Sequence, residues 1–544
     1  MSKISGMRYA LFLIGIIGLL GGVALAKGGL FVDRYEGDVA HLLDILLRID
    51  AGYVLHKDIS TPLGIVAFYP ITLFSIFGLG FGQSFVAAQI LIAVLLAPMV
   101  TRVAVSRLSG FGAWAFGLIV MTIVLSLVHG EDVASTSASM YYNRWAWAMS
   151  FVAIFLATIP AHEGTLRPRL DGLIIGVLLA ALALLKPTYF IAFLVPIVAA
   201  LALRGAWLSL VFGLLSGGVV ALLVAVGFGV DFYFAYINDL LSVAQSPTRA
   251  APGADFVEVL NGPRFLIGTL VLVLSIIVLR QGRQGRAGLV LLLLAPGFIY
   301  VTYQNFGNDP KWLLFLCVFL LAHRPLRSTR VIFNADARNA CAALALVSFA
   351  LIAPSFQNMI TSPMRHFSEV EDDYQVQLKT PPKAHDVWVY ADRVTKVNET
   401  TPMVLRVPDL SSYGAPMDAP VMFLGEELPR CQVQSGDAVL HRYMADRLQD
   451  APFNFAPQSQ FFITDVATII SIEGGFAPLK GGAPWYYSGT PGIENADAIV
   501  IPLCPIDVRS QQTALAALEN AGLVLSRPIR DEVMWVYPIK KAEK

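Results

Sequence analysis

The sequence predicts a polytopic α-helical membrane protein, with about 11–13 transmembrane helices, that ends in an α/β domain. The first observation is composition, because 56% of the 544 residues are hydrophobic and only 14% are charged. The second is charge: residues 1–362 carry 23 Lys+Arg and 16 Asp+Glu, whereas residues 363–544 carry 16 and 23. The third is that short β-rich runs follow Ser362. We therefore expect a transmembrane domain over 1–362 and a soluble domain over 363–544.

Apolar stretches approaching the ~20 residues that a crossing helix needs fill the first part of the chain. They lie near residues 9–26, 62–79, 84–101, 110–128, 143–160, 171–186, 187–203, 207–228, 264–279, 287–303, 311–323 and 338–354. Basic residues cluster in some of the connections, and such connections are typically cytoplasmic. They are Lys3, Arg8, Arg102, Arg107, Arg167, Arg169, Arg204 and the segments 280–286 and 323–330. This pattern predicts that 129–142, 229–263, 304–310, the Lys186–Pro187 junction and the C-terminal domain are extracytoplasmic.

This topology is inconsistent at one point, because the number of crossings does not match the predicted sides. The loop 27–61 and the Arg102 turn should lie on opposite sides, yet two apolar stretches separate them. The stretch 62–79 contains Pro70 and ends in GLGFG, so we predict that it is re-entrant or tilted rather than a full crossing.

The loop 27–61 stands out because it holds six of the sixteen acids in residues 1–362. They are Asp33, Glu36, Asp38, Asp44, Asp50 and Asp58. Carboxylates beside a bilayer are costly when unpaired, so this density indicates a site. From Asp38 to Ile49, polar residues including His41 and Arg48 fall on one helical face, as in a helix lying along a membrane surface. The alternative is a solvated connection between two spans.

Later boundaries add cations and amides. Arg144, within Tyr141–Trp145, enters a span at a predicted external boundary, where a guanidinium can hold a phosphate. Lys186 lies between two apolar runs; it either snorkels outward or meets a lipid phosphate. Asn305, Asn308 and Asp309 crowd a short external loop, which suits sugar hydroxyls or a capped turn. The segment from Asp231 predicts an interfacial helix.

In the C-terminal part we predict strands at 387–391, 498–503 and 533–539 and a helix at Ser510–Ala521 that ends at Gly522. Trp485-Tyr486-Tyr487, amid glycines, either stacks on a sugar or anchors a turn. If this domain is extracytoplasmic, a Cys431–Cys504 disulfide is expected, although counting does not fix the pairing. The chain has no P-loop, GxGxxG, HExxH or CxxC motif, and no basic aromatic stripe for nucleic acid.

The N-terminal 200 residues resemble the GT-C glycosyltransferases, in particular the protein-mannosyltransferase-like branch. The resemblance rests on a first span followed by a loop with Glu36 and Asp38, then Gly52-Tyr53, Lys57-Asp58 and Pro62-Leu63-Gly64. The adjacent Asp-Glu pair common in that branch is missing, because Gly37 separates the two acids. The resemblance implies a bacterial inner-membrane enzyme, with a periplasmic active site, that uses a polyprenyl-phosphate-linked sugar.

The resemblance implies roles for these residues. Asp38 or Glu36 would be the base or would bind a divalent metal such as Mg or Mn, with Asp58 as a second acid. Arg144, Lys186 and Arg48 would meet the donor phosphate. Substrate contacts are expected from His41, Tyr142, Asn143, Asn305, Asn308 and Asp309. The acceptor would be a glycan, lipid or protein. Two rival functions are a multi-span transporter or flippase and a non-catalytic subunit of envelope polysaccharide assembly; the acids crowd into loops rather than mid-span, which argues against transport.

Overall fold

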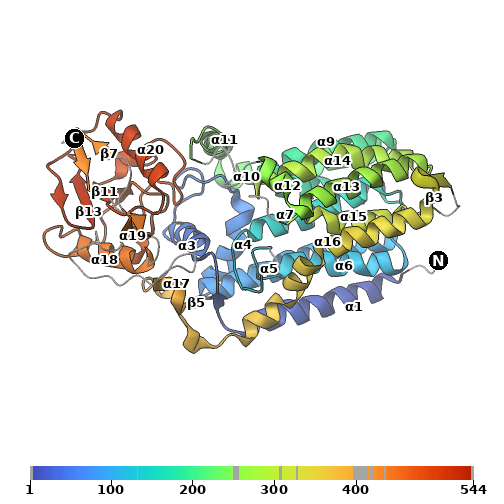
Figure 1. Cartoon of the computed structure of the whole chain (residues 1–544), viewed down its shortest axis with the longest axis horizontal. Helices are drawn as coiled ribbons and strands as arrows, with labels where there is room; N and C mark the ends of the chain where they lie inside the picture. Colours follow the sequence, from blue (N-terminus) through green and yellow to red (C-terminus); the bar gives the residue numbers. More distant parts are fainter. Residues whose placement is uncertain are drawn as a thin grey trace.

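The computed structural model describes residues 4–130, 133–248, 256–305, 309–325, 329–395, 414–415, 421–429, 432–433 and 437–540. A bundle of long helices carries the C-terminal domain at one end, and the chain begins at the other end (Figure 1). The predicted fold class, a polytopic helical protein with a C-terminal α/β domain, is confirmed. We call the two ends of the bundle the domain end, next to the C-terminal domain, and the basic end, where Arg102, Arg107 and Arg204 lie.

Each of the predicted apolar stretches corresponds to a helix of the bundle. The helices are α1 (Gly6–Ile16), which continues through a π-helical turn (Ile17–Gly21) into α2 (Gly22–Ala26), α4 (Ile65–Ile76), α5 (Phe81–Arg107), α6 (Gly110–Leu125), α7 (Tyr141–Thr158), α8 (Pro168–Ala183), α9 (Pro187–Leu203), α10 (Trp207–Phe228), α13 (Pro263–Gln281), α14 (Gly285–Gln304), α15 (Trp312–Ala322) and α16 (Ala337–Ser368). By length and composition, six helical segments among the described residues can cross a membrane: Gly6–Ala26, Phe81–Arg107, Trp207–Phe228, Pro263–Gln281, Gly285–Gln304 and Ala337–Ser368. Helix α16 extends past the predicted domain boundary at residue 362.

Helix α4 explains why the predicted topology did not close. Its 12 residues span only about 18 Å, compared with roughly 30 Å of hydrocarbon. At its start, the Gly64 amide donates to the Leu185 carbonyl at the domain end, 3.1 Å away. Shortly after its end, the Gly82 amide donates to Asp386 of the C-terminal part, 2.9 Å away. Both ends of α4 therefore lie at the domain end, and α5 makes the next passage through the bundle.

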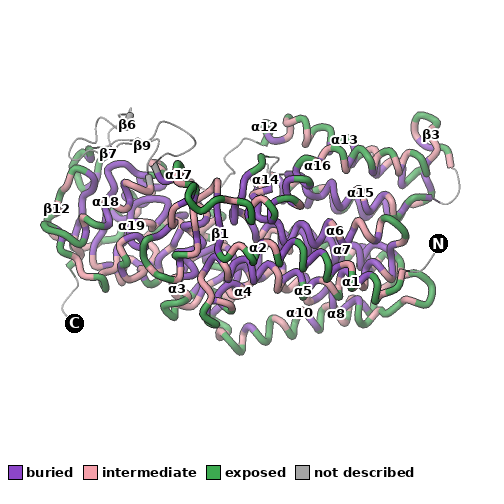
Figure 2. The backbone as a smooth tube through the Cα atoms, turned by 90° about the horizontal axis from the view of Figure 1, so that it is seen from below, coloured by how far each residue is buried: buried purple, intermediate pink, exposed green. Residues whose placement is uncertain are grey.

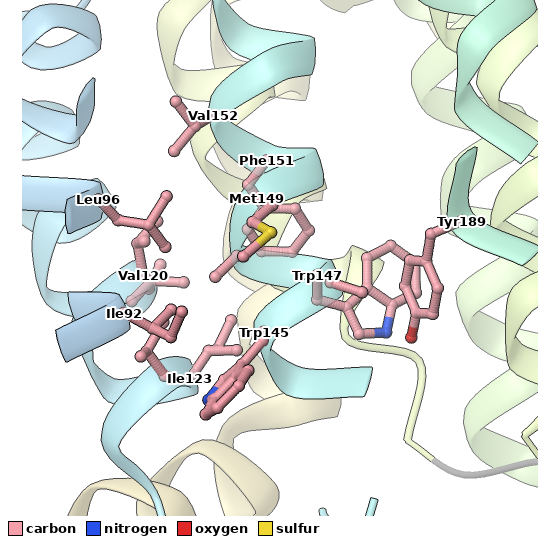
Figure 3. Close-up of a cluster of buried hydrophobic side chains, with 14 of the residues drawn as sticks. Ile92, Leu96, Val120, Ile123, Trp145, Trp147, Met149, Phe151, Val152 and Tyr189 are labelled. Carbon is pink, nitrogen blue, oxygen red and sulfur yellow. The ribbon is translucent and has the colours of Figure 1, made fainter. Parts of the chain in front are cut away.

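Helix α7 runs through the centre of the bundle. All of its residues except Tyr142 are buried, and its side chains reach α5, α6 and α9 (Figure 3). Trp145 packs on the side of α5 and α6, whereas the Trp147 ring lies edge-on to Tyr189 of α9 at 5.3 Å. Because close-packed interiors resist displacement, this packing fixes the start of α7, where polar residues enter the bundle.

Helix α10 lies at the edge of the bundle and is held by glycine-mediated packing against α8. Figure 2 shows mostly exposed and half-buried residues along α10, in contrast to the buried centre. A Cβ on Gly176 would lie 2.0 Å from the Gly213 carbonyl oxygen, so only glycine permits this approach. Ser216 adds a hydrogen bond from its Oγ to the Leu173 carbonyl, 3.0 Å away. Small residues of this kind are a common means of packing helices in membranes.

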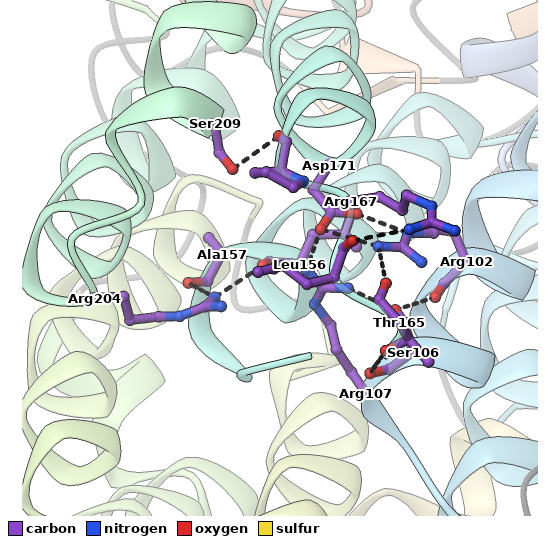
Figure 4. A network of polar contacts seen from close by, with 12 residues as sticks. Arg102, Ser106, Arg107, Leu156, Ala157, Thr165, Arg167, Asp171, Arg204 and Ser209 are labelled. Atoms are coloured by element: carbon purple, nitrogen blue, oxygen red, sulfur yellow. Dashed lines mark hydrogen bonds and ion pairs between the residues drawn. The ribbon is translucent and has the colours of Figure 1, made fainter. Parts of the chain in front are cut away.

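At the basic end, two arginines of α5 meet one carboxylate (Figure 4). Asp171, at the start of α8, accepts Arg102 Nε and Arg107 Nη2, each at 2.7 Å. Arg204, after α9, donates to the carbonyls of Leu156 and Ala157 at 3.2 and 2.7 Å. Arg102, Arg107 and Arg204, which were predicted to share one side of the membrane, thus lie in one region of the bundle.

The C-terminal domain is built on a four-stranded mixed sheet in the order β10-β11-β13-β12. Its strands are β10 (Phe461–Ile463), β11 (Ala498–Pro502), β12 (Ile529–Arg530) and β13 (Met534–Pro538), and its helices are α18 (Asp437–Gln449), α19 (Ile469–Glu473) and α20 (Val508–Glu519). The predicted strands at 498–503 and 533–539 are β11 and β13, and α20 is the predicted helix. Cys504 is disulfide-bonded. Cys431 lies outside the described residues, so the predicted pairing stays a prediction.

A second sheet joins the first loop to the C-terminal part. Strand β1 (Leu30–Val32) pairs in parallel with β5 (Val387–Tyr390), the predicted 387–391 strand, and β4 (Tyr374–Val376) pairs antiparallel with β5. Asp386, directly before β5, accepts the Gly82 and Gln83 amides and so caps α5 from about 300 residues away. The shorter elements are α3 (Glu36–Asp50), α11 (Asp231–Ala244), α12 (Phe256–Asn261), α17 (Ala391–Thr395), β2 (Arg330–Val331), β3 (Ala335–Asp336), β6 (Gly414–Ala415), β7 (Val421–Phe423), β8 (Glu426–Leu428) and β9 (Gln432–Val433).

Candidate functional site

The candidate site lies at the domain end, where α3 and α7 begin. Tyr35 and Met140, the residues just before these helices, adopt the left-handed conformation with φ of 64° and 53°. This conformation costs a non-glycine residue roughly 1–2 kcal/mol, so surrounding contacts must hold both turns. Helix N-termini carry partial positive charge, and their first amides can bind anions.

Asp38 is held by Ser139, which belongs to the turn before α7. The Ser139 hydroxyl donates to Asp38 Oδ2. His129 Nδ1 lies 2.9 Å from the same hydroxyl, and its ring stacks on Tyr35 with centroids 4.3 Å apart. Because the Ser139 proton points to Asp38, His129 Nδ1 must be the donor of the second contact. The three residues form a chain that orients the Asp38 carboxylate.

The charge state of His129 supports that assignment. Burial is the largest cause that lowers its pKa, and together with the nearby cations Lys311, Arg144 and Arg34 it brings the pKa to about 3. The imidazole is therefore neutral at physiological pH and keeps one proton, which Nδ1 carries. A neutral ring adds no positive charge to the cations that surround it.

Glu36, the other predicted acid, has a different environment. Its carboxylate makes a bidentate ion pair with Arg393 of α17, with contacts of 2.9 and 3.2 Å. This pair ties the start of α3 to the C-terminal part. Glu36 accepts a guanidinium, and Asp38 accepts the Ser139 hydroxyl. Among the described residues, no group of three or more His, Cys, Asp or Glu side chains is placed to hold a metal. A divalent metal at Asp38 or Glu36 stays a prediction.

Lys186 and Arg144 are the cations that α7 and α9 bring together. Lys186 Nζ donates to Asn143 Oδ1 at 2.8 Å and to Asn305 Oδ1 at 2.5 Å, and it lies 5.2 Å from the Tyr142 ring centroid. The predicted substrate contacts Tyr142, Asn143 and Asn305 thus gather around Lys186. Lys186 and Asn305 are 119 positions apart in the sequence.

Arg144 is 1% exposed, and its Nη1 donates to the backbone carbonyls of Val128 and Ser139. Its Nε and Nη2, together with Asn143 Nδ2, are buried without a hydrogen-bond acceptor among the described residues. Buried donors are nearly always paired, and each one left unpaired costs about 1–3 kcal/mol. Three such donors on consecutive residues indicate a place for an external acceptor.

The remaining predicted residues have other surroundings. Asp309 is buried and accepts Arg264 Nη1 at 2.9 Å, with Lys311 Nζ 4.0 Å away. Arg48 is engaged by Asp44 at 2.7 Å and by the Leu479 carbonyl at 2.7 Å. Asp58 accepts the Val54 amide at 2.9 Å and faces Lys480 at 3.5 Å. Asn308 lies outside the described residues.

These contacts give Arg48 and Asp58 a role in docking the C-terminal domain on the first loop. His41, on the same loop, also contacts the domain: its ring lies edge-on to Trp485, with ring centroids 5.4 Å apart. The polar face of α3 therefore turns toward the C-terminal domain, not only toward water. The predicted helix from Asp38 to Ile49 is confirmed as part of α3.

An apolar groove of about 560 Å³ opens between α8, α9 and α10. Its lining extends from Ser209 and Leu201 near the basic end to Leu184 and Tyr233 near the domain end. Leu184 lies two residues before Lys186. Residues 209–221 of α10 alone cover about 18 Å, which exceeds the depth of one bilayer leaflet. The lining is almost entirely apolar and long enough for a hydrocarbon chain.

Several residues of this site carry no signal in the sequence. Ser139 lies in a run of small residues and carries no pattern of its own. His129 begins the loop as a single histidine, and one histidine has no spacing that indicates a role. Arg393 and Lys311 reach the site only through long-range folding, so spacing along the chain holds no signal for them.

No family model and no curated protein matches this chain. Among solved structures, it is similar to the crystal structure of ArnT from Cupriavidus metallidurans bound to undecaprenyl phosphate. The two share 10% identity over 98% of each chain, with a TM-score of 0.41. A likeness at this TM-score transfers neither a ligand nor a reaction to this chain.

Proposed function

We propose that this chain is a membrane glycosyltransferase that moves a sugar from a polyprenyl phosphate to a hydroxyl acceptor on the extracytoplasmic side. One observation carries the proposal. Buried donors of Arg144 and Asn143 lack an acceptor beside Lys186, between the end of an apolar groove and a held carboxylate, Asp38. Buried donors are nearly always paired, and a phosphate supplies several oxygens that can accept from them.

The reaction follows from these positions. Asp38 takes the proton of the acceptor hydroxyl as its oxygen attacks the anomeric carbon. The bond between that carbon and the phosphate oxygen breaks, and polyprenyl phosphate leaves with the bonding electrons. Lys186, Arg144 and the N-terminus of α7 stabilise the charge that develops on the phosphate. A polyprenyl-linked donor explains how a sugar enzyme works without a nucleotide-binding fold.

Asp38 is better placed as the base than Glu36. The Ser139 hydroxyl donates to Asp38, and the neutral His129 orients that hydroxyl. The Glu36 carboxylate is bound by Arg393, and protonating it would break a bidentate ion pair. We assign Asp38 as the general base and Glu36 as a residue that positions the start of α3.

The first test is direct binding of sugar-free polyprenyl phosphate to the purified full-length protein in nanodiscs. Arg144→Ala and Lys186→Ala should each weaken binding roughly ten- to hundredfold, because each removes a charge-assisted contact with the phosphate. Arg204→Ala is the matched control, since Arg204 also donates to two backbone carbonyls but at the other end of the bundle. Wild-type affinity in both site variants would place the donor elsewhere.

The rival functions make different demands on Asp38. A transporter or flippase, or a non-catalytic assembly subunit, needs no base at this position. Either would keep its cellular function in an Asp38→Asn variant, whereas a glycosyltransferase would lose transfer while still binding the lipid phosphate.

A further inference from the structure

One face of the C-terminal domain meets α3 close to Asp38. Trp485 of this domain lies edge-on to His41, with an angle of 74° between the rings. His41 follows Asp38 by three residues on α3, so both side chains lie on neighbouring parts of one helical face. The rise between them is only about 4.5 Å. His41 and Trp485, which we call the aromatic corner, therefore lie beside the proposed base, Asp38.

The segment that carries Trp485 is fixed from two directions. Trp485 forms an antiparallel bridge with Ala467, and the Tyr486 amide donates to the Val466 carbonyl at 2.7 Å. On the other side, the Ser246 hydroxyl, after α11, donates to the Tyr487 carbonyl at 2.6 Å. A ring held in this way loses little further freedom when it binds a ligand, which favours binding.

The corner remains accessible from outside. Asp38, His41 and Trp485 are each half-buried, unlike the fully buried Arg144 on the donor side. The nearby polar contacts, from Thr468 to Asp44 and from Arg48 to the Leu479 carbonyl, close the far side of the same interface. A ligand can thus approach Asp38 along the Trp485 ring without entering the lipid groove.

We infer that Trp485 and His41 form the acceptor subsite and that the acceptor presents a pyranose ring there. This inference rests on the proposed function and specifies its second substrate. A pyranose has an apolar C–H face that packs on an indole and hydroxyls at its rim that can reach Asp38 and His41. A lipid acceptor would instead need a broad apolar surface for its chains, and the polar residues around this corner do not provide one. The C-terminal domain thereby selects the acceptor, while the bundle holds the donor.

The test uses saturation-transfer NMR on the full-length protein in nanodiscs, with methyl pyranosides of glucose, galactose, mannose and N-acetylglucosamine as probes. We expect at least one of them to bind the wild type. That signal should fall roughly three- to tenfold in Trp485→Ala, because an aromatic contact is lost, and should be largely kept in Trp485→Phe. Trp207→Ala is the control, since Trp207 is 64% exposed near the basic end.

Sugar-free polyprenyl phosphate is titrated into the same samples. The inference is overturned if no pyranoside binds the wild type, or if Trp485→Ala leaves the signal unchanged while the lipid still binds. Loss of the pyranoside signal with wild-type lipid binding supports it and excludes a misfolded variant. If the wild type does not bind the lipid phosphate, the proposed function fails, and the acceptor assignment falls with it.

Discussion

The two ends of the bundle use buried arginines in different ways. At the basic end, Arg102 and Arg107 share the carboxylate of Asp171, so positive and negative charges meet inside the protein. At the domain end, Arg144 donates to backbone carbonyls, and two of its nitrogens have no acceptor within the part of the chain that the structure describes. The first arrangement holds helices together. We propose that an anion from outside completes the second.

Burial of a cation therefore does not by itself indicate a ligand-binding site. What distinguishes the domain end is the combination of unmatched donors with strained turns at Tyr35 and Met140. Strain and unmet hydrogen bonds both reduce stability, and a protein keeps them where function requires them. The basic end shows the opposite balance, and we expect substitutions at the two ends to separate stability from activity.

The largest expected effect is on catalysis at the domain end. Asp38→Asn should reduce sugar transfer by about 10²–10⁴-fold, because an amide cannot take the acceptor proton. Binding of polyprenyl phosphate should remain near wild type. Glu36→Gln should cost far less transfer, since it weakens the Arg393 pair but leaves Asp38 in place. Single-turnover transfer and lipid binding, measured on the same preparations, check both expectations. Equal loss of transfer in the two variants would contradict the assignment of the base.

The next effect is on stability at the basic end. Asp171→Asn leaves Arg102 and Arg107 without their carboxylate, and breaking such a buried arrangement typically costs about 3–5 kcal/mol. Arg144→Gln should cost much less or even stabilise the ligand-free protein, because it removes a buried charge that lacks a carboxylate. Thermal unfolding in nanodiscs without lipid phosphate measures the contrast. A larger loss for Arg144→Gln than for Asp171→Asn would reverse the comparison.

A smaller effect concerns pH and His129. Its pKa in the folded protein is about 3, below the roughly 6.5 of an unfolded chain. The unfolded state therefore takes up the proton first, and stability falls as pH drops below about 6.5, by up to about 1.4 kcal/mol per pH unit. His129→Gln should make unfolding less pH-dependent between pH 6.5 and 4. The surface residue His385 provides the control, His385→Gln, and an unchanged slope in His129→Gln would contradict the buried neutral state.

Much of the fold could be predicted because a continuous run of apolar residues is enough to predict a membrane helix. Each predicted stretch became a helix, and the basic connections gathered at one end as expected. The short α4 was anticipated from Pro70 and the glycines that follow it. Strands β5, β11 and β13, which belong to two different sheets, were also predicted, because each is rich in β-branched and aromatic residues. A local sequence pattern is enough to predict an element when burial of that element alone determines its structure, as in an apolar helix or a buried strand.

The site was less predictable because it depends on contacts between distant residues. Asp38 was identified as a candidate, but its choice over Glu36 depends on Ser139 and on Arg393, which lies 357 residues from Glu36. Arg48 was expected to meet phosphate, yet its donors engage Asp44 and the Leu479 carbonyl. Charge alone does not reveal whether a residue will meet a ligand or another part of the same chain. That depends on tertiary packing, which one sequence does not display.

Two nitrogens of Arg144 have no acceptor among the described residues, and we propose that polyprenyl phosphate provides it. The most direct measurement is the shift in unfolding temperature on adding polyprenyl phosphate to the wild type, Asp171→Asn and Arg144→Gln. Ligand at 100 times Kd stabilises a protein by about 2.7 kcal/mol. We predict that Asp171→Asn starts at a lower temperature but gains as much as the wild type, whereas Arg144→Gln loses most of the gain. A full gain in Arg144→Gln would contradict the account.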